Sequence, residues 1–242
     1  MVAAFLAVPV CAQSQAPAGS AYSQTYSVFI RGELAGAEQV TETVDSQGNV
    51  VSKSHHELLV SDGNQVFKTA FDTVMTYKKD SLAPVTYQLR YSANGSGDYC
   101  ELTCRDGQIH RVLSRGGQVS EIEHPLGPET VVFDFNVYHL YDYVIRHYDF
   151  NKKGRQVFQD FVPIVGGEIP LALTWIDDGD LDYGRGKLKV RNFRIDLVGV
   201  MMGTVSVDEQ NRLVRVLIRD KDLEVLRGDL VPAATPGAPG DR

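Results

Sequence analysis

The sequence predicts a mainly β fold, either a curved antiparallel sheet or a barrel-like meander, with one central α-helix. Three observations support this class. Short runs in which apolar and polar residues alternate recur along the 242 residues. Turn pairs such as Asn94-Gly95, Asp106-Gly107 and Gly116-Gly117 separate these runs, and tight turns of this kind connect antiparallel strands. A stretch near residues 136–149 instead repeats its apolar residues at helical spacing.

The first twelve residues have the pattern of a secretory signal peptide. The apolar run from Val2 to Val10 is too short to span a bilayer, and Val10-Cys11-Ala12 has the small-x-small form of a cleavage site. No Lys or Arg precedes Arg31, so we expect the true start to lie upstream of Met1. Residues 13–21 read as a spacer, and the expected location is periplasmic or secreted. An ordinary cytoplasmic N-terminus is the alternative.

Residues 22–230 are expected to form a single β-rich domain that begins with strands. Tyr26, Val28 and Ile30 share one face of the first strand, and Gly32 with Gly36 frames the turn that follows. Eight strand-like runs, each bounded by turn residues, extend to residue 123. This succession predicts a meander of antiparallel strands.

The central helix is predicted near residues 136–149. Asp134 or Asn136 can cap its start, Asp142 faces Arg146 four residues on, and Gly154 follows its end. Its apolar face consists of Val137, Leu140, Tyr141, Val144 and Tyr148.

Strands resume after this helix, and residues 231–242 read as a disordered tail. The most economical architecture is one curved sheet with the helix in its concave side or plugging one end. Two β-subdomains divided near the helix are the alternative.

Four features carry a resemblance to a known family: the central helix, the closing strand pair, and the motifs Tyr26-x-Val28-x-Ile30-x-Gly32-x-x-x-Gly36 and Phe158-x-x-Phe161-Val162-Pro163. Together they resemble exported bacterial proteins classed as a domain of unknown function, in the family numbered 3108. The resemblance spans most of residues 22–229. It implies the fold and the compartment, and it brings no activity and no catalytic residues.

Composition argues against nucleic acid as a partner. The formal charge is −7, and no basic block is longer than a pair such as Lys78-Lys79, whereas a duplex binder needs a concentrated positive face. No Gly-x-Ser-x-Gly elbow is present, and Gly166-Gly167 lacks the following helix and Lys of a phosphate-binding loop. We therefore expect no cofactor.

Removal of the signal peptide leaves two cysteines, Cys100 and Cys104. In one regular strand they share a face about 13 Å apart, roughly twice the reach of a disulfide. A disulfide therefore requires a bend or bulge between them, and the sequence leaves that question open.

Two groups of residues have side chains that could bind a metal ion. Asp178, Asp180 and Asp182 have the spacing that opens a calcium loop, but Tyr183 and Lys189 stand where such a loop needs Gly and Glu. A plain hairpin loop is the favoured interpretation.

Histidines offer a weaker metal site. His139 and His147 would lie about 12 Å apart along a helix, too far to share one ion. His55 and His56 are adjacent in a strand and point to opposite faces.

Aromatic residues are the better candidates for ligand binding. The chain has 11 tyrosines, several of them near the predicted helix, and a tyrosine has an apolar ring with a polar tip. The candidate ligand-binding residues are Tyr138, Tyr141, Tyr148 and Trp175. The alternative is that these rings only fill the space between helix and sheet.

Three functions follow, in this order. The first is an exported, non-enzymatic envelope protein that binds an apolar or amphipathic ligand, with a lipid or another envelope component as its partner. The second is an enzyme acting on envelope polysaccharide, whose carboxylates converge only on folding. The third is a structural or assembly component. The sequence indicates no transmembrane helix and does not indicate an oligomeric state.

Overall fold

The computed structural model describes residues 22–61, 66–94, 96–183 and 186–231. The predicted signal peptide and spacer, and nearly all of the predicted tail, lie outside the described residues.

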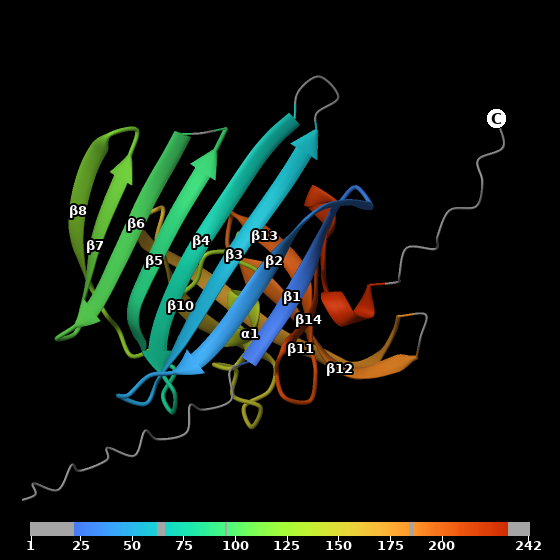
Figure 1. The fold of residues 1–242 in the computed structure, drawn as a ribbon. Helices are drawn as coiled ribbons and strands as arrows, with labels where there is room; N and C mark the ends of the chain where they lie inside the picture. Colours follow the sequence, from blue (N-terminus) through green and yellow to red (C-terminus); the bar gives the residue numbers. More distant parts are fainter. Residues whose placement is uncertain (1–21, 62–65, 95, 184–185, 232–242) are drawn as a thin grey trace, which may run out of the picture.

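Fifteen strands form one sheet (Figure 1). The strands are β1 (Tyr22–Ile30), β2 (Glu33–Val44), β3 (Asn49–Ser61), β4 (Val66–Lys78), β5 (Pro84–Ala93), β6 (Ser96–Arg105), β7 (Gln108–Arg115), β8 (Gln118–Pro125), β9 (Thr130–Val132), β10 (Arg155–Val162), β11 (Gly167–Asp182), β12 (Lys187–Leu197), β13 (Met201–Val207), β14 (Leu213–Ile218) and β15 (Leu223–Arg227). The short helices are α1 (Leu140–Ile145), η1 (Arg219–Lys221) and η2 (Gly228–Leu230). The predicted mainly β class with one α-helix among the described residues is confirmed.

The sheet consists of two meanders that are joined where the first strand, β1, pairs with the last, β15. The strand order runs from β8 down to β1, then from β15 down to β9, so that β1 pairs with β15 near the other end of the chain. All pairs are antiparallel except β9 with β10. The sheet curves around an interior but β8 and β9 remain its two edges, so the barrel is not closed by hydrogen bonds between the described strands.

Turn chemistry explains the hairpins. Arg31 and Gly32 connect β1 to β2 with φ values of 53° and 77°, and Asp106 and Gly107 connect β6 to β7 with 52° and 72°. Positive φ at both central residues matches the twist of antiparallel strands, and Gly adopts it without strain. The predicted turns at Gly32 and at Asp106-Gly107 are confirmed, whereas Gly36, predicted to frame the first turn, lies within β2 and pairs with Leu58 of β3.

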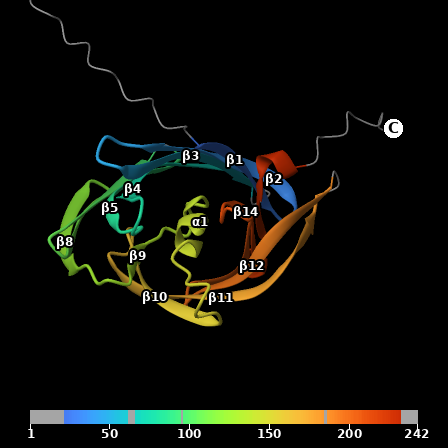
Figure 2. The same cartoon turned by 90° about the horizontal axis from the view of Figure 1, so that it is seen from below.

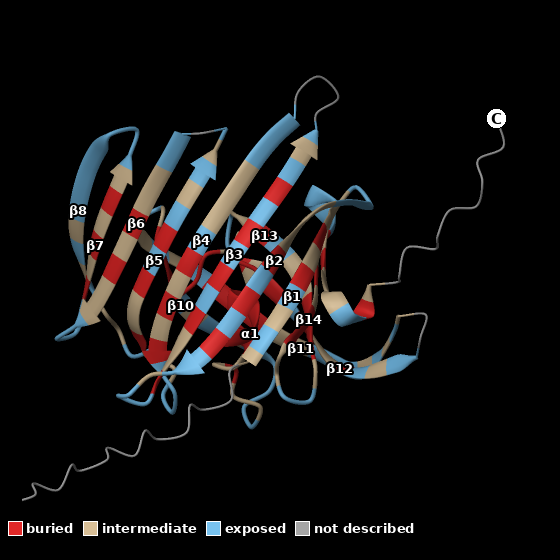
Figure 3. Ribbon diagram, in the orientation of Figure 1, coloured by how far each residue is buried: buried red, intermediate tan, exposed pale blue. Residues whose placement is uncertain are grey.

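Strand alternation places one face of the sheet inside (Figure 3). Along β4, Thr73, Met75 and Tyr77 are buried while Asp72 and Lys78 are exposed. The same period-2 pattern appears on β3 and β5. The inner face therefore forms the wall of a core, and residues 134–148, called the central segment below, occupy part of that core.

The helix α1 lies inside the ring of strands (Figure 2), and all six of its residues are buried. It is much shorter than the predicted helix of residues 136–149. Residues on both sides form tighter turns instead, with bonds three residues apart such as Val137 N–H to Asp134 O and His147 N–H to Val144 O. The helical spacing is real, but it belongs to a series of turns with one α-helical turn in the middle.

Candidate functional site

A charged cluster fixes one end of the central segment to the sheet. Asp142 on α1 forms an ion pair with Arg146, whose Nη2 lies 2.9 Å from Asp142 Oδ1. Its other carboxylate oxygen, Oδ2, lies 3.5 Å from Arg212 Nη1. Arg212 also bonds Glu42 of β2 at 2.6 Å. The predicted pairing of Asp142 with Arg146 is confirmed, and these charges neutralise one another within the protein.

A buried ion pair holds the start of α1. Glu38 of β2 is fully buried, its Oε2 accepts the backbone N–H of His139 at 3.0 Å, and its Oε1 accepts from His139 Nδ1 at 2.7 Å. Burial alone would raise the pKa of Glu38, but the facing His139 outweighs it and the pKa lies below its usual value. These two carboxylates, Glu38 and Glu42, therefore serve to anchor the segment inside the sheet.

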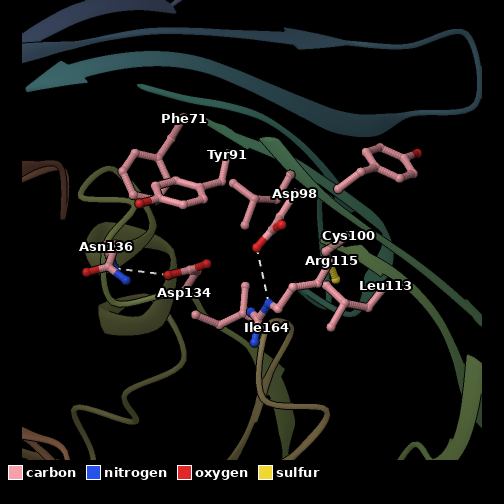
Figure 4. A pocket seen from close by; sticks show the side chains of 11 residues that line it. Phe71, Tyr91, Asp98, Cys100, Leu113, Arg115, Asp134, Asn136 and Ile164 are labelled. Carbon is pink, nitrogen blue, oxygen red and sulfur yellow. Dashed lines mark hydrogen bonds and ion pairs between the residues drawn. The ribbon is translucent and has the colours of Figure 1, made fainter. Parts of the chain in front are cut away.

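Beyond α1 the interior contains a cavity of about 300 Å³. It lies on the inner face of β4 to β7, strands that extend past α1 toward the top of Figure 1. The residues that line it are Phe71, Leu89, Tyr91, Asp98, Tyr99, Cys100, Leu113, Arg115, Asp134, Asn136 and Ile164. Figure 4 shows them around the space.

The wall of the cavity is largely apolar and aromatic. Phe71 and Tyr91 are cross-strand partners whose ring centroids are 4.9 Å apart. Phe67 occupies the same face of β4, four residues from Phe71, and is 37% exposed. The apolar surface thus continues from the cavity toward solvent.

Ile164 forms the opposite wall because its turn is anchored to the sheet. The carbonyl oxygen of Pro163 accepts a hydrogen bond from Arg111 Nη1 at 3.3 Å and from the Cys100 thiol at 3.5 Å. Arg111 lies on the inner face of β7 and is buried. The turn after β10 is thereby fixed over the cavity.

Asp134 is the most deeply buried polar group at the cavity, with no exposed surface. Its Oδ1 accepts the backbone N–H of Asn136 at 3.1 Å, and its Oδ2 accepts the Tyr87 hydroxyl at 3.4 Å. Burial is the main cause that raises the pKa of Asp134 to about 6, and Glu38 adds to the rise. Figure 4 shows its carboxylate across the cavity from Leu113 and Cys100.

The other charges at the cavity neutralise each other. Arg115 Nε lies 3.1 Å from Asp98 Oδ2, with side chains that are 57% and 25% exposed. This pair therefore marks the solvent side of the cavity. Cys100, by contrast, is buried, and burial raises the pKa of its thiol to about 11, so the thiol is protonated.

The structure places the predicted ligand-binding residues elsewhere. Tyr138, Tyr141 and Tyr148 are buried, and Tyr141 donates its hydroxyl to Phe135 O at 3.0 Å. Trp175 lies on β11, 3.2 Å from Asp178 through its indole nitrogen. None of the four lines the cavity. The three tyrosines are buried between the central segment and the sheet, and the role of the four residues in ligand binding stays a prediction.

The acidic run is part of a strand rather than a hairpin loop. Asp178, Asp180 and Asp182 lie in β11 opposite Arg191, Lys189 and Lys187 of β12. Opposite charges in direct cross-strand register stabilise the pairing. Among the described residues, no group of three or more His, Cys, Asp or Glu could hold a metal ion.

Cys100 and Cys104 are free thiols in β6. The pairing of β6 with β5 and β7 shows no register shift between them. The strand lacks the bend that a disulfide requires, so the disulfide left open by the sequence is not formed.

The histidines are also separated. His55 is exposed and bonds Asp72 at 2.7 Å, whereas His56 points inward and stacks on Phe71 with centroids 5.3 Å apart. His147 packs against Tyr143, and burial lowers its pKa to about 4. The opposite orientations predicted for His55 and His56 are confirmed.

Sequence reasoning considered Asp134 only as a helix cap. Phe71 and Leu89 lie in strands with period-2 burial, but nothing in the local sequence indicates that the loop residue Asp134 joins them. The parallel strand β9 leads the chain inward, where Phe133 N–H bonds Asp160 Oδ1 at 3.0 Å. That long-range contact positions Asp134.

Comparison with known proteins bears on the fold. Among solved structures, the chain is similar to a β-barrel-like protein of domain of unknown function DUF1849 from Brucella abortus, with a TM-score of 0.56 and 7% identity over 85% of this chain and 93% of that chain. No family model and no curated protein matches. At this identity the likeness shows a barrel-like β fold alone. Membership of the family numbered 3108 stays a prediction.

None of the helices that the structure describes is long and apolar enough to cross a membrane.

Proposed function

We propose that this chain is a non-enzymatic binding protein that holds a small amphipathic ligand in the cavity between β4–β7 and the segment around Asp134. The observation that carries the proposal is the cavity itself. Its volume of about 300 Å³ lies at the lower end of the range of small-molecule sites, and apolar walls with a few converging polar groups are typical of them.

The position of the cavity supports binding over a purely structural role. The central segment packs closely against the rest of the inner face, with Leu140 and Tyr141 almost fully buried. The space beyond it is bounded by anchored groups, including the turn at Ile164. An apolar ligand would cover Leu89, Leu113 and the Phe71–Tyr91 pair, which gains hydrophobic stabilisation.

The arrangement gives little support to polysaccharide hydrolysis. Of the described carboxylates, Asp98 and Asp134 line the cavity, and Asp98 is paired with Arg115. Hydrolysis of this kind needs one carboxyl to act as an acid and a second, free one as base or nucleophile. Binding requires neither role.

We also propose that the protein acts outside the cytoplasm, on the pattern of residues 1–12. N-terminal sequencing of protein from its native host should then find a chain that begins near Gln13. Detection of an intact Met1 would contradict export.

The binding proposal is tested with the uncharged fluorescent probe N-phenyl-1-naphthylamine. The wild-type protein is expected to bind it saturably in a one-to-one ratio, and Ile164→Trp, which fills the cavity from its turn, should weaken binding by at least about tenfold. Leu113→Phe provides a second filling variant from the sheet side.

The matched control is Val165→Trp, since Val165 lies in the same turn but is 59% exposed and does not line the cavity. It should bind the probe like the wild type. Absence of saturable binding, or equal affinity in the filling variants and the control, would contradict the proposal.

A further inference from the structure

We propose that the ligand of this cavity carries a cationic amine head that pairs with Asp134, with its apolar part against the aromatic and aliphatic walls. This inference rests on the proposed binding function and deepens it by naming the ligand class.

Asp134 lacks a counterion. Among the described residues no Lys or Arg forms an ion pair with it, and its hydrogen bonds come from the Asn136 backbone and the Tyr87 hydroxyl. A buried carboxylate without a cation is costly to hold in an apolar site. Asp134 has no exposed surface in the ligand-free protein, so an ammonium group in the cavity would supply the missing charge by displacing the atoms that cover the carboxylate.

The cation that lines the cavity already has a carboxylate partner. Arg115 lies at the solvent side and is held by Asp98 at 3.1 Å. Asp98, Asp134 and Arg115 together leave one unbalanced negative charge, and it lies on the buried Asp134. The carboxylate of Asp134 would repel an anionic ligand head, and the cavity offers that head no free cation as a partner.

Two aromatic rings line the cavity on the side of the carboxylate (Figure 4). Phe71 and Tyr91 form a contacting pair on the cavity wall, and aromatic faces attract cations. The same rings also accept an alkyl chain. This wall therefore suits both the ammonium head and the alkyl chain of an alkylamine. It disfavours a carboxylate head.

The test compares three probes with one alkyl chain and different heads: octylamine, octanol and octanoate. Each displaces N-phenyl-1-naphthylamine from the wild-type protein at pH 7.5, where an alkylamine is protonated because such amines have a pKa of about 10.4. Octylamine should compete at least about tenfold better than octanol or octanoate.

The variant Asp134→Asn keeps the shape and the hydrogen bond from Asn136 but removes the charge. It should weaken octylamine by about tenfold and leave octanol within about twofold. The control Asp196→Asn makes the same change in net charge on β12, where Asp196 alternates with the buried Ile195 and Leu197. It should leave all three probes unchanged.

The possible failures are distinct. If the naphthylamine binds in the cavity but octanol or octanoate competes as well as octylamine, the amine inference is overturned while the binding function stands. Equal octylamine affinity in wild type and Asp134→Asn also overturns it. If the naphthylamine itself does not bind, the proposed function fails.

Discussion

The two buried carboxylates Glu38 and Asp134 have pKa values that are shifted in opposite directions. Glu38 faces His139, which keeps its pKa low, whereas Asp134 faces an apolar cavity and its pKa rises to about 6. The difference comes from their partners, because both side chains are fully buried. Glu38 therefore stabilises the fold as an anion, while the ionised form of Asp134 costs stability.

The stability of the protein should consequently depend on pH through Asp134. The folded protein binds this proton more tightly than the unfolded chain, whose Asp pKa is 3.8. The resulting stabilisation is full below about pH 3.8 and is lost as the pH rises through about 6, with a total on the order of 3 kcal/mol.

Asp134→Asn removes this dependence. Urea unfolding at pH 4.5 and 7.5 should show the variant gaining about 2 kcal/mol relative to wild type over that interval. Glu38 raises the pKa of Asp134, and the charge of Asp134 in turn raises the pKa of Asp160, so the measured difference includes the loss of the coupling between Asp134 and Asp160. If the difference in unfolding free energy between the variant and the wild type is the same at both pH values, Asp134 is not desolvated as described.

Among the elements, the contact of β2 with β3 depends on Gly36. A Cβ built on this residue would overlap the backbone carbonyl oxygen of Glu57 on the neighbouring strand. The two strands approach where Gly36 pairs with Leu58, close to the register shift between β1 and β2. Only a residue without a side chain fits there.

Gly36→Ala should therefore lower the free energy of unfolding by at least about 1–3 kcal/mol, because rigid backbone and not a movable side chain must shift. Gly167→Ala is the matched control, since a Cβ there meets no atom within 4 Å. Thermal unfolding of both variants measures the effect. Equal melting temperatures would mean that the strands separate at Gly36 without cost.

Elements were predictable where a local rule decides them. The positive-φ turns at Gly32 and Gly107 and the alternation of inward residues follow from sequence neighbours. The length of α1 was predicted wrongly because the residues before it share the apolar spacing of a helix but are held by a distant carboxylate, Glu38. The strand at Asp178–Asp182 was missed because its basic partners on β12 lie across a turn.

At the scale of the whole molecule, one curved sheet encloses a central segment that fills only part of the interior. The general architecture followed from hairpin punctuation, since consecutive strands pair with each other from β1 to β8. The cavity did not follow, because it depends on how far the segment from Asp134 to Tyr148 extends under β4–β7. That extent is set by contacts with Glu38 of β2, Asp160 of β10 and Arg212, which precedes β14, rather than by local pattern.

The most direct test of this account is a crystal structure of the protein with N-phenyl-1-naphthylamine. We expect electron density for the naphthyl and phenyl groups of the probe between Leu113 and Ile164, beside the Phe71–Tyr91 pair. Density for the probe on the outer face of the sheet, or beside Trp175 with the cavity unoccupied, would contradict the assignment of the cavity as the binding site.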